Sequence, residues 1–156
     1  MITEKPHVSI VQKKVQGNPF EYSQKDLTAV KDMVHDSLEL IGGFNKIING
    51  DQTVILKPNL VEVPVESTGG SVLTDHRVIE ATVSLLKDHG VKYVQVGEGK
   101  SVNLRHESAG PRQAFEKTGI ADVVKRAGGE IVCWDEEPYI DVEVPGGEVL
   151  SKLGVP

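Results

Sequence analysis

Three short apolar segments alternate with amphipathic segments along most of this 156-residue chain. The apolar segments are Thr53–Leu56, Tyr93–Val96 and Ile131–Trp134. Short apolar runs of this kind, bounded by turn residues, are typical of strands buried on both faces of a parallel sheet. Parallel strands need long crossover connections, which are usually helical. The pattern therefore predicts an α/β fold, a three-layer α/β sandwich with a mainly parallel sheet and right-handed crossovers.

The segments between the predicted strands carry helical periodicity. Apolar residues recur at three- and four-residue steps over Leu27–Ile41 and again over Val78–Leu86. Pro111 suits the first turn of a third helix, which Thr118–Gly119 should interrupt before a last helical segment at Ile120–Ala127. Helices therefore connect the strands in the order that a parallel sheet requires.

The two ends of the chain also have β character. His7–Val15 is rich in β-forming residues and predicts a first strand. Apolar residues alternate over Ile140–Val144 before the turn residues Pro145–Gly147, which predicts a C-terminal β-hairpin at an edge of the sheet. Ser151–Val155 is similar to the opening of a further element. We therefore expect residues 1–156 to form a single α/β domain that is an N-terminal fragment of a larger protein.

Composition excludes several functional classes. The 17 basic and 23 acidic residues give a net charge of −6, which argues against a nucleic-acid partner. Cys133 is the single cysteine, so the chain has no internal disulfide and no iron–sulfur motif. No apolar run approaches the roughly 20 residues of a membrane helix, and the N-terminus does not resemble a signal peptide. We therefore expect a cytoplasmic protein without a membrane partner.

Ligands of open α/β sheets bind outside the carboxyl ends of the strands. Lys57 directly follows the first apolar segment, and Asn59 lies two residues further on. Lys57 could present its ammonium group to a phosphate or carboxylate, with Asn59 forming hydrogen bonds beside it. In the alternative interpretation, Lys57 extends into solvent and Asn59 only completes the turn.

A glycine-rich loop follows the second apolar segment. Gly97 and Gly99 would let the backbone approach a ligand closely, and Glu98 would be available to a metal or a substrate hydroxyl. A simple glycine turn with a solvated acid explains the same residues. The Gly-Lys-Ser ending also occurs in phosphate loops, but Val94 stands where that pattern needs a glycine. We therefore reject a phosphate loop and predict no metal site.

Other polar residues are weaker candidates. Asp75 opens a predicted helix, where it is either part of an anion site or a helix cap. His76 is the best-placed base, although a first-turn histidine is more often simply exposed. His106–Glu107 could close over a site or could be a solvated loop. Cys133 is predicted to be a buried core thiol.

The order of these motifs resembles the DUF362 family, a family of unknown function. The motifs are the long helix ending at Gly42–Gly43, the segment Gly50–Leu60 with its Leu-Lys-Pro-Asn-Leu ending, Thr74–Asp75, Val96–Gly99 and a helix through Gly119. The resemblance implies that this chain is the N-terminal half of the family's domain. Family members are often joined to ferredoxin-like segments with four-iron clusters, which implies a redox link. The cofactor of this chain stays open.

Two functions are compatible with these observations. In the first, the chain is half of a redox-linked enzyme that binds a small anionic ligand at the carboxyl ends of the strands. In the second, it is a non-catalytic binding or assembly module that docks with its missing half or with a second copy, and a homodimer is expected because an edge or apolar face is left uncovered. The predicted ligand-binding residues are Lys57, Asn59, Asp75, Gly97, Glu98 and Gly99.

Overall fold

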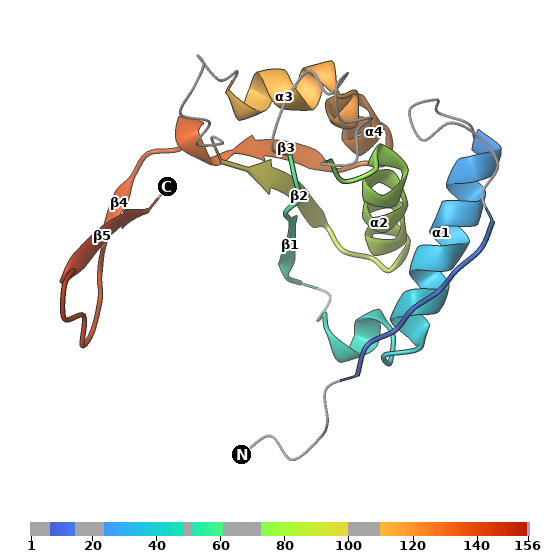
Figure 1. The fold of residues 1–156 in the computed structure, drawn as a ribbon, viewed down its shortest axis with the longest axis horizontal. Helices are drawn as coiled ribbons and strands as arrows, with labels where there is room; N and C mark the ends of the chain where they lie inside the picture. The colour runs from blue at the N-terminus through green and yellow to red at the C-terminus, as the bar shows by residue number, and fades with distance from the viewer. Residues whose placement is uncertain (1–6, 15–23, 49–50, 61–72, 100–109, 156) are drawn as a thin grey trace.

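A parallel sheet of three strands forms the centre of the computed structural model (Figure 1). The structure describes residues 7–14, 24–48, 51–60, 73–99 and 110–155. The strands are β1 (Thr53–Leu56), β2 (Tyr93–Glu98) and β3 (Glu130–Cys133), in the spatial order β1-β2-β3. Their registers place Leu56 opposite Val96, and Val96 opposite Ile131. The predicted α/β class and parallel sheet are confirmed.

Helices follow β1 and β2 in the chain. They are α2 (His76–Asp88), α3 (Pro111–Lys117) and α4 (Ile120–Arg126). Gly119, with φ of 73°, ends the first helical segment after Pro111 and separates α3 from α4, as the sequence predicts. The connections from β1 to β2 and from β2 to β3 run in the same direction across the sheet. Because the two connections have the same handedness, their helices lie on the same face of the sheet. The helix α1 (Gln24–Glu39) packs on α2 (Figure 1).

The helices and one face of the sheet enclose a hydrophobic core. Val83 of α2, Val96 of β2, Phe115 of α3 and Val124 of α4 are completely inaccessible to solvent. Val54 and Leu56 of β1 pack against the same cluster. This core fixes the strands and therefore positions the residues at their carboxyl ends.

No helix of the described residues covers the opposite face of the sheet, although Trp134 packs on Gly97 at the carboxyl end of β2 on that side. The prediction that β1 is buried on both faces is wrong, because Ile55 is 56% exposed. The helices stack on one face only, so alternate residues of every strand point away from them. We call these residues the open face; they are Thr53, Ile55, Tyr93, Gln95, Glu130 and Val132.

The predicted first strand over His7–Val15 is also wrong for its described part, residues 7–14. This segment runs alongside α1 rather than in the sheet (Figure 1). The Ser9 and Ser37 hydroxyl groups are 2.8 Å apart, and the Lys13 ammonium donates to Asp36 at 3.0 Å. A β-rich composition favours an extended backbone, but a strand also needs a free edge to pair with, and here the neighbour is a helix.

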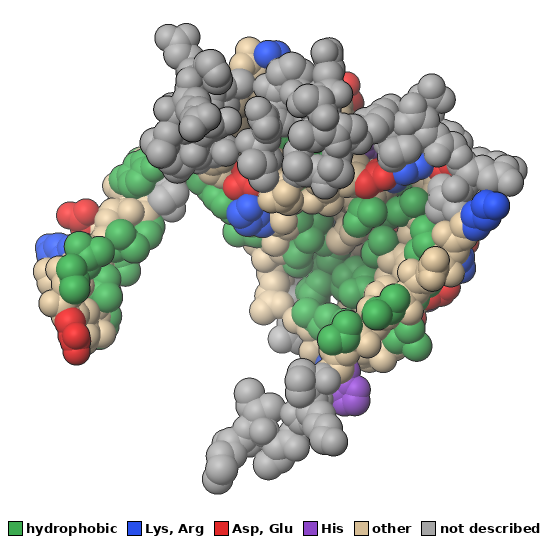
Figure 2. Space-filling model, viewed as in Figure 1, with side chains coloured by type: hydrophobic (Ala, Val, Ile, Leu, Met, Phe, Trp, Pro, Cys, Tyr) green, Lys and Arg blue, Asp and Glu red, His purple; other side chains and the backbone are tan. Residues whose placement is uncertain are grey.

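The C-terminal hairpin is confirmed. Its strands are β4 (Ile140–Glu143) and β5 (Lys152–Val155), so residues expected to open a further element supply its second strand. Among the described residues β4 and β5 pair only with each other, and they form a separate two-stranded sheet instead of an edge of the parallel sheet. In the space-filling view the hairpin stands apart from the body of the molecule (Figure 2).

Candidate functional site

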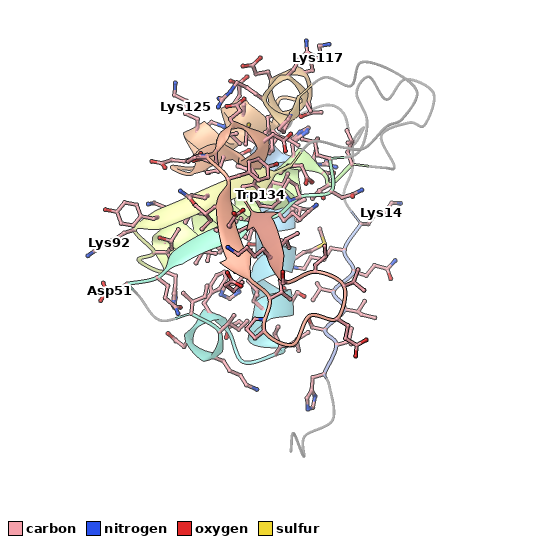
Figure 3. All side chains as sticks on the ribbon, turned by 90° about the vertical axis from the view of Figure 1, so that its left-hand side faces the viewer. Lys14, Asp51, Lys92, Lys117, Lys125 and Trp134 are labelled. Atoms are coloured by element: carbon pink, nitrogen blue, oxygen red, sulfur yellow. The ribbon has the colours of Figure 1, made fainter. Side chains whose placement is uncertain are left out.

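The carboxyl edge of the parallel sheet brings together the residues that follow the three strands. Lys57 follows β1, Glu98 ends β2, and the short 3-10 helix η2 (Trp134–Glu136) follows β3. Lys92 and Asp51 mark the opposite, amino edge of the sheet, where both are labelled in Figure 3. Because all three strands run in one direction, residues more than 40 positions apart in the sequence meet at one edge.

Lys57 and Glu98 form an ion pair at this edge. The Lys57 Nζ donates to Glu98 Oε2 at 2.8 Å and to the Pro58 carbonyl oxygen at 3.3 Å. Glu98 Oε1 accepts from the backbone N–H of Gly99 at 3.0 Å. The Glu98 side chain is only 13% exposed, whereas that of Lys57 is 56% exposed. The carboxylate is therefore held in place on both oxygens, and the ammonium group is presented to solvent.

Asn59 connects β1 to the start of α2. Its backbone N–H donates to the Thr74 hydroxyl at 2.8 Å, and its carbonyl oxygen accepts from the Thr74 N–H at 2.9 Å. One residue further on, Leu60 and Leu73 form an antiparallel bridge. These backbone contacts place Asn59 close to the N-terminus of α2, which begins at the same edge of the sheet.

Asp75 caps α2. Its Oδ1 accepts from the Arg77 backbone N–H at 2.8 Å, and its carboxylate also accepts from Nε and Nη2 of the same side chain. Burial raises the pKa of Asp75, but the hydrogen bonds and charge of Arg77 outweigh it and leave the pKa below its ordinary value. Of the two interpretations of Asp75, the structure supports the helix cap.

Gly97 lies within β2 and Gly99 directly follows it, and both lie against η2. A methyl group added at Gly97 would lie 2.9 Å from the Trp134 ring, and one at Gly99 would lie 3.6 Å from both Trp134 and Asp135. Gly97 therefore allows the close approach of an indole ring. The sequence predicted a close approach at these glycines but assigned it to a ligand.

Several charged pairs were not identified from the sequence. Arg112 makes a bidentate contact with Glu136 beside the end of β3. Arg126 of α4 binds the buried Glu80 of α2 through two hydrogen bonds of 2.9 Å. The side chain of Arg77, which pairs with Asp75, is only 8% exposed. Sequence spacing carries no signal for Arg112 or Arg126, because their partners are brought near only by folding.

The other residues and segments singled out in the sequence lie partly inside and partly outside the described residues. His76 is the first residue of α2 and is partly buried. His106–Glu107 lies outside the described residues, as do Lys100 and Ser101 of the Gly-Lys-Ser segment. Within the described part of the chain, no cluster of three or more His, Cys, Asp or Glu residues could hold a metal ion. In the same residues, no helix is long and apolar enough to cross a membrane.

Cys133 is buried, as predicted, with 2% of its surface exposed. Burial raises the pKa of its thiol, and Glu136 raises it further against the opposing effect of Arg112. We expect iodoacetamide at pH 8 to modify Cys133 at least about tenfold more slowly in the native protein than in guanidinium chloride. Mass spectrometry of timed samples measures both rates. Equal rates would contradict the buried, protonated thiol.

The fold and the edge together define an α/β protein with a lysine–glutamate pair at the carboxyl end of a parallel sheet. The family model described as "Domain of unknown function (DUF362)" matches residues 54–156, which is more than half of the chain. The chain belongs to the DUF362 family. The match begins within β1, so α1 lies outside it. No curated protein and no solved structure matches the chain.

Proposed function

We propose that this protein binds a small anion, a phosphate or a carboxylate, at the carboxyl edge of its parallel sheet through Lys57. The Lys57–Glu98 pair is the observation that carries the proposal. An ammonium group has three N–H donors, and the described residues supply acceptors for two of them. The remaining donor belongs to a half-exposed group whose position is set by a nearly buried carboxylate.

Glu98 positions Lys57 and also weakens its attraction for an anion. The carboxylate neutralises most of the local positive charge, and the net charge of −6 repels anions at longer range. Affinity must therefore come from direct hydrogen bonds to the ammonium group, each contributing roughly 1.5–3 kcal/mol when it is charge-assisted. A redox link and a cytoplasmic location stay predictions from the sequence.

The first test replaces Lys57 with methionine, which keeps the apolar stem and removes the charge. Inorganic phosphate, pyrophosphate and malonate are screened by thermal shift, and the best of them is titrated by calorimetry. We expect Lys57→Met to weaken binding about tenfold or more, the change expected when one such hydrogen bond is lost. Equal affinity in wild type and Lys57→Met would exclude Lys57 as a residue that binds the anion.

Lys92→Met is the matched control. Lys92 is an exposed lysine at the amino end of the same sheet, and its Nζ lies 3.7 Å from Asp51 Oδ1. Lys92→Met therefore removes the same charge and keeps the same apolar side-chain stem, but at the end of the sheet opposite to Lys57. Its affinity for the anion should stay within about twofold of wild type. A loss as large as that of Lys57→Met would show that only the overall charge matters.

Glu98→Gln tests the pair from the opposite side. The amide removes the competing negative charge but keeps the size of the side chain, so anion binding should become tighter. Calorimetry with the same anion measures the change. Weaker binding in Glu98→Gln would mean that positioning of Lys57 by the carboxylate outweighs the charge that it neutralises.

A further inference from the structure

The C-terminal hairpin is amphipathic. Its register pairs Ile140 with Val155 and Val142 with Leu153, and directly paired residues share one face of a ribbon. The alternate residues lie on the other face, where Lys152 forms an ion pair with Glu143 at 3.2 Å. One side of the hairpin is therefore apolar and the other is charged.

The apolar side of the hairpin is exposed. Ile140, Val142 and Leu153 are 61%, 42% and 49% exposed. The hairpin stands apart from the body, with open space between them in Figure 2. A two-stranded hairpin is at best marginally stable alone, because it has no core on which to pack its apolar side. This side requires a surface on which to dock.

The open face of the sheet is a second exposed surface on the same chain, where one apolar residue of each strand lies beside the polar residues Thr53, Gln95 and Glu130. Ile55 and Tyr93 are 56% and 61% exposed, and the partly exposed Val132 lies on the same face. A sheet face of this kind packs well on another sheet about 10 Å away. Each chain thus carries both a ribbon with an apolar side and a sheet face able to receive one.

The connection to the hairpin holds it away from its own sheet. Only three residues, Glu137–Tyr139, separate η2 from β4. Pro138 has a restricted φ, and Glu137 before it is extended with φ of −82° and ψ of 149°. In the structure this link holds the hairpin away from the body of its own chain (Figure 2). A second copy has no such restriction.

We propose that two copies of this chain form a symmetric dimer by exchanging hairpins, so that the apolar side of each hairpin covers the open face of the other copy. The size of the interface favours exchange over one-sided docking. A stable interface involves about 20–30 residues from each partner. In the exchange every copy contributes both its hairpin and its open face, which doubles the contact that one hairpin makes on one sheet face.

Sedimentation of the 156-residue chain tests the assembly. We expect a dimer, and we expect Val142→Asp on the hairpin and Ile55→Asp on the open face each to raise the dimer dissociation constant at least about tenfold. Asp141→Asn is the control, because Asp141 lies on the charged side of the hairpin and should leave the dimer unchanged. Circular dichroism verifies that each variant is folded, and Tyr93→Asp replaces Ile55→Asp if that variant unfolds.

Mixing the two variants distinguishes exchange from other dimers. A mixed dimer of Val142→Asp and Ile55→Asp contains one intact hairpin on one intact open face, so mixing should partly restore dimers that neither variant forms alone. Stacking of two hairpins, or of two open faces, would not be restored in this way. A wild-type monomer, a dimer insensitive to both substitutions, or a mixture without recovery would each overturn the proposal. None of these readouts depends on anion binding by Lys57.

Discussion

Asp75→Ala should lower the free energy of unfolding by about 2–3 kcal/mol and leave anion binding at Lys57 unchanged. Two losses add together. The N–H of Arg77 loses its helix cap, and the buried guanidinium of Arg77 loses the carboxylate that accepts from its Nε and Nη2. Because Asp75 is 29% exposed, water offsets part of the cost of a fully buried charge. Urea denaturation measures the change.

The same pair makes stability depend on pH. The pKa of Asp75 lies below its ordinary value of 3.8 because of the contacts with Arg77, which outweigh the effect of burial. The ionised carboxylate therefore stabilises the fold above the unfolded-state pKa, and this contribution is lost as the pH falls through the lower folded-state pKa. Asp75→Ala should flatten the acid side of the stability curve below about pH 4.

Asp88→Ala is the control for both measurements. Asp88 ends the same helix and pairs with Lys31, but its side chain is 65% exposed. Its loss should change stability by less than about 1 kcal/mol. If Asp75→Ala were equally mild and instead weakened anion binding, Asp75 would be a ligand residue and not a cap.

Gly97→Ala should destabilise the protein by about 1–3 kcal/mol, the usual range for inserting a methyl group into a packed site. The new methyl group would lie 2.9 Å from the Trp134 ring, and β2 in the middle of the sheet leaves little room for the backbone to shift. Thermal and urea unfolding measure the loss. A neutral Gly97→Ala would mean that the indole ring moves away without cost.

A double-mutant cycle with Trp134→Ala identifies the cause. If the clash with the ring causes the loss, Gly97→Ala should be nearly neutral in the Trp134→Ala background. Gly110→Ala is the matched control, because Gly110 has φ of −59° and no atom would lie within 4 Å of the added methyl group. Gly110 is also the N-cap of α3, where alanine is less favourable than glycine, so its substitution should cost less than about 1 kcal/mol.

Much of the fold could be predicted from local patterns. The strands at Thr53–Leu56 and in β2, the helix break at Gly119 and the C-terminal hairpin all depend on residues that are neighbours in the chain. Strand polarity also predicts that Lys57 and Glu98 share one edge, because the carboxyl ends of parallel strands coincide. Local patterns do not report what packs on a strand, so β1 was wrongly expected to be buried on both faces.

The candidate site, like the fold, was determined in part by the sequence and in part by the tertiary structure. The sequence by itself determined an α/β protein with chemistry-bearing residues at the ends of its strands, since periodicity and turn residues act within a few positions. Only the tertiary structure decided which of them meet. It pairs Lys57 with Glu98, assigns Asp75 to Arg77, and places Trp134 on Gly97. These contacts join residues up to 41 positions apart, or depend on which side chains become buried, and burial is a property of the packed molecule and not of any short segment.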